Sequence, residues 1–219
     1  SRSSIDEIYE TGFKSIKVAS YDCASYQLIR ELVDKFDELI VSTGGTYDDE
    51  IEKTTNILKD SNYSLLHCVT LYPTPLSQMN LERMLWLKKF TNNIGLSEHT
   101  LFSRDSIQAS MAAIAIGAKI IERHFTILPE SETKDGPVSI NPKALKELSR
   151  FAKMEQEERL IFLNKKYPAW KIMMGSEKRK LSHEEILNRN YYRGRFASPR
   201  KETENGQRMI FNWEETSLK

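Results

Sequence analysis

The sequence predicts an α/β protein built from repeated β/α units, and three observations support this prediction. Short apolar segments alternate with amphipathic stretches over about the first 165 residues. The repeat is regular, because Lys17 to Ser42 and Ser42 to His67 are both 25 positions apart. Each apolar segment ends in polar residues, as in folds where the carboxyl ends of parallel strands form the active site.

Five segments are expected to be parallel strands. Each contains a short, mostly apolar run, which is typical of a strand that is buried on both faces. The predicted strands are Ser15–Ser20, Glu38–Gly44, Tyr63–Thr70, Ile94–Thr100 and Lys119–Thr126.

Helical patterns separate and follow these strands. Thr46 is the expected N-cap of the second helix, because acidic residues that favour the helix dipole follow it. Ser103 is the expected N-cap of the fourth helix, and Gly117 is its expected C-terminal stop. The predicted helices are Ser25–Phe36, Tyr47–Asp60, Leu81–Phe90, Ser103–Ile116 and Pro142–Asn164.

Two architectures have this element order. Five units complete a doubly wound sheet of the flavodoxin-like type, whereas a (β/α)8 TIM barrel would lack three upstream units. All five predicted strands end in polar groups, and only in a barrel does every strand tip face one central mouth. We therefore predict a TIM barrel that is incomplete at the N-terminus and keep the doubly wound binding module as the alternative. The β/α period ends near Lys165, and a short helix is expected near Ser182–Asn190.

Composition excludes several classes of protein. The 219 residues include 32 basic and 31 acidic side chains, and this balance argues against a nucleic-acid or anionic-membrane surface. No apolar run approaches the roughly 18 residues that span a bilayer, and the polar N-terminal segment predicts no signal peptide. Cys23 and Cys68 are too few for a disulfide framework and are expected to be ordinary buried residues. We expect a cytoplasmic protein.

Two histidines form the first candidate site. His99 and His124 follow consecutive predicted strands, whose backbones run about 4.8 Å apart in a sheet. Two imidazoles there could hold one divalent cation and leave positions open for water and substrate. Histidine with oxygen ligands suits Mn, Fe, Co or Zn. The alternative is two unrelated histidines, each satisfied by hydrogen bonds.

A second group of residues is suited to an anionic ligand. Lysine and hydroxyl groups at strand ends can form a phosphate or carboxylate cradle. Lys17 is the most informative, because a lysine within an apolar strand is costly to bury without an anion. The hydroxyls alone are also common helix caps. The predicted cradle is Lys17, Ser20, Ser42, Thr43 and Ser97.

Acid and base groups are the third candidate set. Glu122 and His124 are two positions apart and should point to the same side of a strand. Asp22, Glu98 and Asp135 are further candidates, although Glu98 could equally be a solvated loop acid. The turn Tyr72–Pro75 could fix Tyr72 over a pocket, or its prolines could simply end the strand.

Taken together, these motifs resemble the sialic acid synthase family, which includes the legionaminic and pseudaminic acid synthases. They occur in the family order and spacing over about residues 10–165. The matching stretches are Lys17-Val18-Ala19-Ser20, Ser42-Thr43-Gly44, Leu66-His67-Cys68, Tyr72-Pro73-Thr74-Pro75, Gly95-Leu96-Ser97-Glu98-His99-Thr100 and Ile121-Glu122-Arg123-His124-Phe125.

The resemblance implies a TIM barrel enzyme that condenses phosphoenolpyruvate with an N-acetylated hexosamine. That sugar would be N-acetylmannosamine or a 2,4-diacetamido hexose, and the products would be a nine-carbon 2-keto acid and phosphate. It implies the C-terminal part of a TIM-barrel synthase domain over residues 1–165, a linker over 166–190 and the start of a truncated antifreeze-like (SAF) domain over 191–219. Family members are homodimers, and without the upstream units this chain alone is expected to be inactive.

The resemblance also implies roles for individual residues. His99 and His124 would bind Mn²⁺, with Mg²⁺ or Co²⁺ as other candidates. Phosphoenolpyruvate would be held by Lys17, Ser20, Ser42, Thr43 and Ser97. Tyr72 and Asp135 would contact the sugar, and Thr70 stands where some members have a ligand-binding asparagine. Glu122 would lie beside the metal, and Asp22 takes the place of a proton-transferring glutamate. The rivals are another phosphoenolpyruvate–aldose synthase, making a 3-deoxy-2-keto sugar acid, and a degenerate, inactive barrel.

Overall fold

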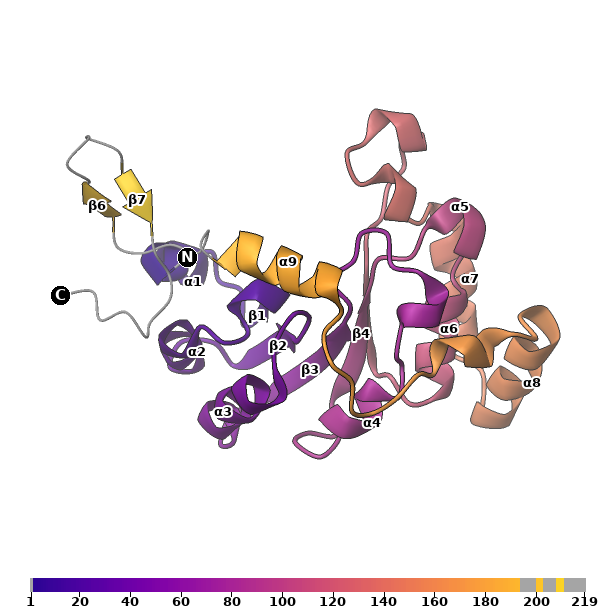
Figure 1. The fold of residues 1–219 in the computed structure, drawn as a ribbon, viewed down its shortest axis with the longest axis horizontal. Coiled ribbons are helices and arrows are strands. Elements are labelled where there is room, and N and C mark those ends of the chain that lie inside the picture. Colours follow the sequence, from indigo (N-terminus) through magenta and orange to yellow (C-terminus); the bar gives the residue numbers. More distant parts are fainter. Residues whose placement is uncertain (1, 194–199, 203–207, 211–219) are drawn as a thin grey trace. The chain divides into compact units, whose positions relative to one another are not determined.

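The computed structural model describes residues 2–193, 200–202 and 208–210 (Figure 1). The chain divides into two compact units, and each is described by itself. The first contains Ser1–Ser64 together with Leu181–Lys219, and the second contains Leu65–Lys180.

The first unit contains two parallel strands with their helices and one helix from the tail. Val18 is paired with Val41 in the register of the two strands. The strands are β1 (Ser15–Val18) and β2 (Glu38–Ser42), and the helices are α1 (Ile5–Glu10), α2 (Tyr26–Val33), α3 (Asp48–Leu58) and α9 (His183–Arg193), with a 3-10 turn, η2, at Ser20–Asp22 (Figure 1).

Amphipathic spacing explains why α2 and α3 pack together in this unit. Leu28 and Leu32 of α2 are four residues apart and both are buried, as are Ile51 and Leu58 of α3. Burial of each such side chain contributes about 1.5–3 kcal/mol to stability. The small helix α1 is anchored by an edge-on contact between the rings of Tyr9 and Phe36, whose centroids are 5.8 Å apart.

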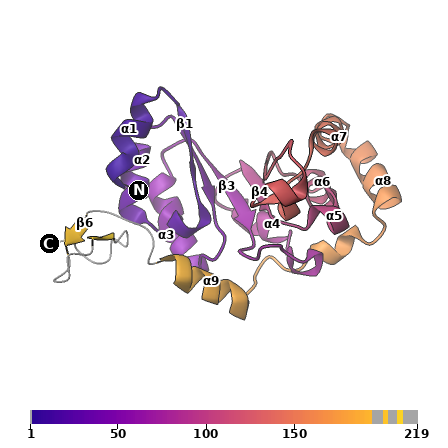
Figure 2. The ribbon, with the colours of Figure 1, turned by 90° about the horizontal axis from the view of Figure 1, so that it is seen from above.

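The second unit is built on three parallel strands, with β4 between β3 and β5. The register pairs His67 with Leu96 and Ser97 with Glu122. Helix α6 is buried along almost its whole length and contacts both α7 and α8 (Figure 2). The strands are β3 (Tyr63–Cys68), β4 (Ile94–Glu98) and β5 (Ile120–Arg123), and the helices are α4 (Arg83–Leu87), α5 (Phe102–Asp105), α6 (Gln108–Ala115), α7 (Pro142–Ala152) and α8 (Gln156–Lys166).

All five predicted strands are present, and their pairing is parallel in both units, which confirms the α/β class. Each strand ends two or three residues before its predicted C-terminal bound, because the last residues of each predicted segment leave the ladder and enter loops. Gly117 ends α6 as expected, with a φ of +107° that favours glycine.

Three helix predictions were wrong in detail. The helix predicted over Ser103–Ile116 is broken at Ser106, whose φ of +53° interrupts the helical backbone, and Leu101 rather than Ser103 takes the N-cap position. The helix predicted over Pro142–Asn164 is two helices, α7 and α8. At the start of α3 the N-cap position belongs to Tyr47 rather than Thr46.

The tail contains two further short strands, β6 (Arg200–Glu202) and β7 (Arg208–Ile210), which pair antiparallel. Most of residues 191–219, where the start of an antifreeze-like domain is predicted, lies outside the described residues. Within the described part of the chain, every helix is too short or too polar to cross a membrane.

Candidate functional site

His99 and His124 lie side by side in the second unit. His99 directly follows β4 and His124 directly follows β5, and these neighbouring strands pair in parallel. The two imidazole centroids are 5.5 Å apart. The prediction that strand pairing brings the two histidines together is therefore confirmed.

Tyr72 covers both histidines. Its ring centroid is 5.0 Å from that of His99 and 5.6 Å from that of His124, and its hydroxyl lies 3.1 Å from Nε2 of His124. Partial desolvation and the Asp135 carboxylate raise the pKa of Tyr72 above its usual value. The hydroxyl therefore stays protonated at neutral pH, with the Asp135 carboxylate and Nε2 of His124 as its neighbours.

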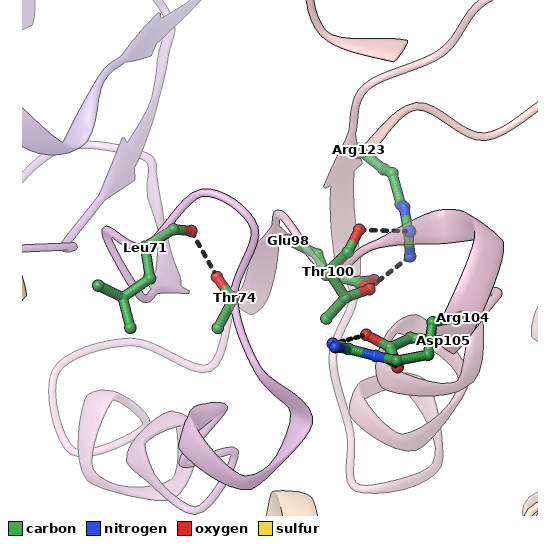
Figure 3. Close-up of polar contacts among 7 residues, drawn as sticks. All are labelled: Leu71, Thr74, Glu98, Thr100, Arg104, Asp105 and Arg123. Carbon is green, nitrogen blue, oxygen red and sulfur yellow. Dashed lines mark hydrogen bonds and ion pairs between the residues drawn. The ribbon is translucent and has the colours of Figure 1, made fainter. Parts of the chain in front are cut away.

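The loop that carries Tyr72 is held by Thr74. The Thr74 hydroxyl donates to the carbonyl of Leu71 at 2.7 Å (Figure 3). The Thr74 backbone N–H donates to the carbonyl of His99 at 2.8 Å. Thr74 is 1% exposed, so these bonds are shielded from water and join the tyrosine loop to the residue that bears one of the two imidazoles.

The donor set suits a divalent cation only in part. Oδ2 of Asp135 lies 3.6 Å from Nδ1 of His124, so both ring nitrogens of this histidine face a side chain. The described residues contain no group of three His, Cys, Asp or Glu side chains arranged to hold a metal. Two imidazoles with open positions match the expected donor set, but His124 must give up one of its contacts to coordinate a cation.

Glu98 is neither a solvated acid nor a free base. It is 1% exposed, and its carboxylate accepts a hydrogen bond from Nη1 of Arg123 (Figure 3). The same carboxylate accepts from the hydroxyls of Thr100 and Ser110. Nη2 of Arg123 also donates to the carbonyl of Thr100 at 3.3 Å. The interpretation of Glu98 as a loop acid was wrong, because the next strand supplies a buried guanidinium that sequence spacing alone does not reveal.

Three other predicted residues belong to the same unit. Ser97, 5% exposed, is paired with Glu122 in the β4–β5 register, and Glu122 alternates with Arg123, so it shares the face of His124. Thr70 follows β3 and is 8% exposed. These residues lie at the same carboxyl ends of the strands as the two histidines.

The remaining predicted residues lie in the first unit, in two neighbouring loops that we call the cradle loops, η2 and residues 43–47. Thr46 connects them, because its hydroxyl lies 3.4 Å from the carbonyl of Ser20. Ser42 and Thr43 are buried at the end of β2. The structure thus brings the hydroxyl-bearing segments together.

Two members of this group differ from expectation. Lys17 was expected to be buried, but it is exposed, and its ammonium lies 3.2 Å from the carbonyl of Val18. The expectation was wrong because Lys17 lies on the less covered side of a short strand. Asp22 is half-buried, and one of its carboxylate oxygens lies 3.3 Å from the Ser25 hydroxyl.

Sequence reasoning missed Arg123 and Arg189. Arg123 stands between Glu122 and His124, and strand alternation alone was enough to place it on the opposite face of β5, whereas its pairing with Glu98 depends on the β4–β5 register. Arg189 lies in the basic tail and is 5% exposed, with bonds to residues more than 130 positions earlier in the chain. No local signal distinguishes it from the exposed basic residues nearby.

A pocket of about 570 Å³ lies on the other face of β5. Its walls include Ile121, Arg123 and Phe125 from β5 and its end, together with Leu145 and Leu148 of α7. None of the predicted site residues lines it, because Glu122 and His124 point to the opposite side of the strand. This pocket is therefore separate from the histidine pair.

Comparison with known proteins places most of the chain in one family. The sequence model of the NeuB family matches residues 1–159. The N,N'-diacetyllegionaminic acid synthase of Campylobacter jejuni is 36% identical over 151 residues, which are 66% of this chain and 44% of that protein. The spore coat polysaccharide biosynthesis protein SpsE of Bacillus subtilis is 28% identical over 201 residues, 89% of this chain and 52% of SpsE. The chain thus spans about half the length of these relatives.

Solved structures share the fold. The crystal structure of SpsE from Bacillus subtilis superposes with a TM-score of 0.72 at 23% identity, covering 96% of this chain and 60% of SpsE. The N-acetylneuraminic acid synthetase of Leptospira borgpetersenii gives a TM-score of 0.64 at 28% identity, covering 86% of this chain and 60% of that protein. The arrangement of parallel strands and helices is therefore one that these proteins also have.

Proposed function

This chain belongs to the NeuB family, and on that premise we propose that it forms part of a synthase for a nonulosonic acid. The complete protein would condense phosphoenolpyruvate with an N-acetylated hexosamine and release phosphate. Relatives named as synthases of diacetyllegionaminic acid, pseudaminic acid and N-acetylneuraminate 9-phosphate support this reaction class. N-acetylmannosamine, its 6-phosphate and 2,4-diacetamido hexoses are the candidate sugars.

We also propose that the five β/α units are part of a (β/α)8 barrel. The parallel pairing in both units and the likeness to SpsE support this architecture. A barrel places the carboxyl end of every strand at one mouth, where enzymes of this fold bind substrate. We propose in addition that the complete protein assembles as a homodimer.

The second unit would bind the sugar and the cation. His99 and His124 would hold Mn²⁺, and when bound it would polarise the aldehyde oxygen of the open-chain sugar as a Lewis acid. The neutral hydroxyl of Tyr72 would donate to a sugar oxygen, because its raised pKa keeps its proton in place. Asp135 would accept from a sugar hydroxyl, and Glu122 would take or return a proton beside the reacting carbon.

The first unit would bind phosphoenolpyruvate. Lys17 would supply a positive charge, and the hydroxyls of Ser20, Ser42 and Thr43 would donate to phosphate or carboxylate oxygens. Carbon 3 of phosphoenolpyruvate bonds to the aldehyde carbon, whose oxygen takes a proton. Water then adds at carbon 2, Asp22 accepts its proton, and phosphate leaves the tetrahedral intermediate to give the 2-keto acid.

The single observation that carries the proposal is the cluster of His99, His124, Tyr72 and Asp135. Two imidazoles with centroids 5.5 Å apart, a neutral phenol and a carboxylate can together bind a cation and a hydroxyl-rich substrate. A purely structural role does not require these groups to converge on a half-exposed surface.

The test is phosphate release from phosphoenolpyruvate by the complete protein that contains these residues. N-acetylmannosamine, its 6-phosphate and a 2,4-diacetamido hexose are offered separately, with Mn²⁺ and with a chelator. We expect release with one sugar only, and its loss on chelation and in His124→Ala. His183→Ala is the matched control, since His183 is an exposed histidine to which no part of the proposed chemistry is assigned.

Other results would point to other functions. Release with an unmodified five- or four-carbon aldose phosphate would favour a synthase of eight- or seven-carbon keto acids. A folded protein that binds Mn²⁺ through His99 and His124 but releases no phosphate with any sugar would favour a degenerate barrel. Mn²⁺ binding that survives loss of both histidines would remove the proposed metal site.

A further inference from the structure

Helix α9 lies beyond the residues that the family model matches, yet it belongs to the compact unit that carries the cradle loops. The family match ends at residue 159, whereas α9 begins at His183. Its start is well defined, because Ser182 and Glu185 exchange hydrogen bonds as a capping box. Helix α9 is therefore a regular, capped helix of the first unit that lies outside the family match.

Arg189 fastens α9 to the second cradle loop, residues 43–47. Its Nη1 donates to the carbonyl of Gly45 at 2.6 Å, and its Nη2 donates to Oε1 of Glu50 at 2.6 Å. The guanidinium also lies over the ring of Tyr47, 4.4 Å from the centroid. The side chains of Arg189 and Glu50 are only 6% and 11% exposed, so the ion pair is shielded from water.

The same contact fixes the geometry of the loop. Gly45 has a φ of +61°, which residues with a side chain rarely adopt, so the loop makes a sharp turn at the carbonyl that Arg189 binds. The other oxygen of Glu50 accepts from the backbone N–H of Tyr47 at 2.9 Å. The Glu50 carboxylate thus caps α3 through Tyr47 and also accepts a hydrogen bond from Arg189. Both hydrogen bonds restrain the loop of residues 43–47.

Tyr192 makes a second contact from the same helix. Its ring stacks on that of Tyr21 with centroids 4.5 Å apart and planes inclined by 23°. Tyr21 is the middle residue of η2 and lies between Ser20 and Asp22, two residues proposed to act on phosphoenolpyruvate. Arg189 and Tyr192 are three positions apart, so they project from neighbouring parts of α9.

We propose that α9 positions the phosphoenolpyruvate cradle, with Arg189 as the positioning residue for the 43–47 loop and Tyr192 for η2. This inference rests on the proposed function of the cradle loops. A bidentate guanidinium is needed because one head group reaches both a carbonyl and a carboxylate, which a lysine ammonium cannot do in the same geometry. Loss of either contact would let its loop move away from the arrangement that binds the anion.

The test compares variants of the complete protein that contains these residues by two measurements. Phosphoenolpyruvate binding is followed by phosphorus NMR, and backbone amide exchange is followed for η2, residues 43–47 and the strands. We expect Arg189→Lys and Tyr192→Ala each to weaken binding at least about tenfold, as loss of supporting partners commonly does. Amide exchange should accelerate in the held loop and remain unchanged in β3–β5.

Two controls separate positioning from general damage. Asn190→Ala changes an exposed neighbour on the same helix and should match the wild type. Tyr192→Phe retains the stacked ring and should restore binding relative to Tyr192→Ala.

Three results would count against a proposal. Faster loop exchange with unchanged phosphoenolpyruvate affinity would show that α9 is only structural, and unchanged exchange and affinity would overturn the inference outright. If the complete wild-type protein does not bind phosphoenolpyruvate, the proposed role of the cradle fails instead. The exchange data then decide whether α9 orders the loops.

Discussion

Glu98 and Arg123 are register partners on β4 and β5, and their side chains form an ion pair that is almost completely buried. The residues that follow them, His99 and His124, carry the two imidazoles of the candidate site. Because side chains alternate along a strand, the pair lies on the opposite face from Glu122 and His124. The ion pair therefore links β4 and β5 on the face of the sheet opposite to the two histidines.

Breaking this ion pair is expected to be costly. Glu98→Gln leaves the Arg123 guanidinium buried without its counter-charge, and such a change typically destabilises a protein by about 3–5 kcal/mol. Adding Arg123→Met should recover part of that loss, because the double variant has no unpaired buried charge. Urea unfolding of the two single variants and the double variant measures the coupling.

The matched control is Lys89→Gln in the same unit. Lys89 pairs with Glu177 at 3.4 Å, and both side chains are more than 40% exposed. Solvent screens this pair, so its loss should change stability by less than about 1 kcal/mol. An equal cost for Glu98→Gln and Lys89→Gln would contradict the interpretation of the buried pair.

His67 should make stability depend on pH. Its side chain is buried, and its Nε2 lies 2.6 Å from the carbonyl of Met79. Burial, together with the nearby cations Arg179 and Arg83, lowers the pKa of His67 to about 3. An unfolded chain has the ordinary pKa of about 6.5 and so binds more protons between pH 3 and 6.5.

Stability from His67 is therefore complete above pH 6.5 and decreases as the pH falls. Between pH 7.5 and 5.0 the loss should be about 2 kcal/mol. His67→Gln keeps an amide donor for Met79 but cannot titrate, so its unfolding free energy should fall less over this range. Urea unfolding of both proteins at the two pH values measures this difference. An equal fall in unfolding free energy for the wild type and His67→Gln would refute the prediction.

Gly95 should not tolerate a side chain. A Cβ at this position of β4 would lie 2.3 Å from the carbonyl oxygen of Ile120 and 2.6 Å from Cδ2 of Leu66. Gly95→Ala must displace β5 or β3, with an expected loss of at least about 3 kcal/mol. Gly117→Ala is the control, since it strains the backbone but meets no atom within 4 Å and should cost about 1–2 kcal/mol. Thermal unfolding should rank the two variants in that order.

Tyr72→Phe separates the tyrosine ring from its hydroxyl. The ring contacts with His99 and His124 remain, and because Tyr72 is half-exposed, thermal stability should change little. If the hydroxyl binds the sugar, kcat/KM for the sugar should fall about tenfold, which corresponds to one lost hydrogen bond. KM for phosphoenolpyruvate should stay constant. A sugar kcat/KM equal to that of the wild type would remove Tyr72 from sugar binding.

Much of the fold and part of the site follow from local sequence pattern. The five strands, the α/β class and the approach of His99 to His124 were predictable, because apolar runs and a period-two alternation are properties of a few consecutive residues. The break at Ser106 and the division between α7 and α8 were not, since helical spacing continues through both points and only the packed backbone interrupts it.

The sequence by itself determined which residues stand at the strand ends, and hence the kind of chemistry available there. Only the tertiary structure decided their partners. The pairing of Arg123 with Glu98 depends on the β4–β5 register, and the bonds of Arg189 to Gly45 and Glu50 join segments more than 130 residues apart. Burial and charge pairing depend on neighbours in space, so these contacts leave no periodic signal in the chain.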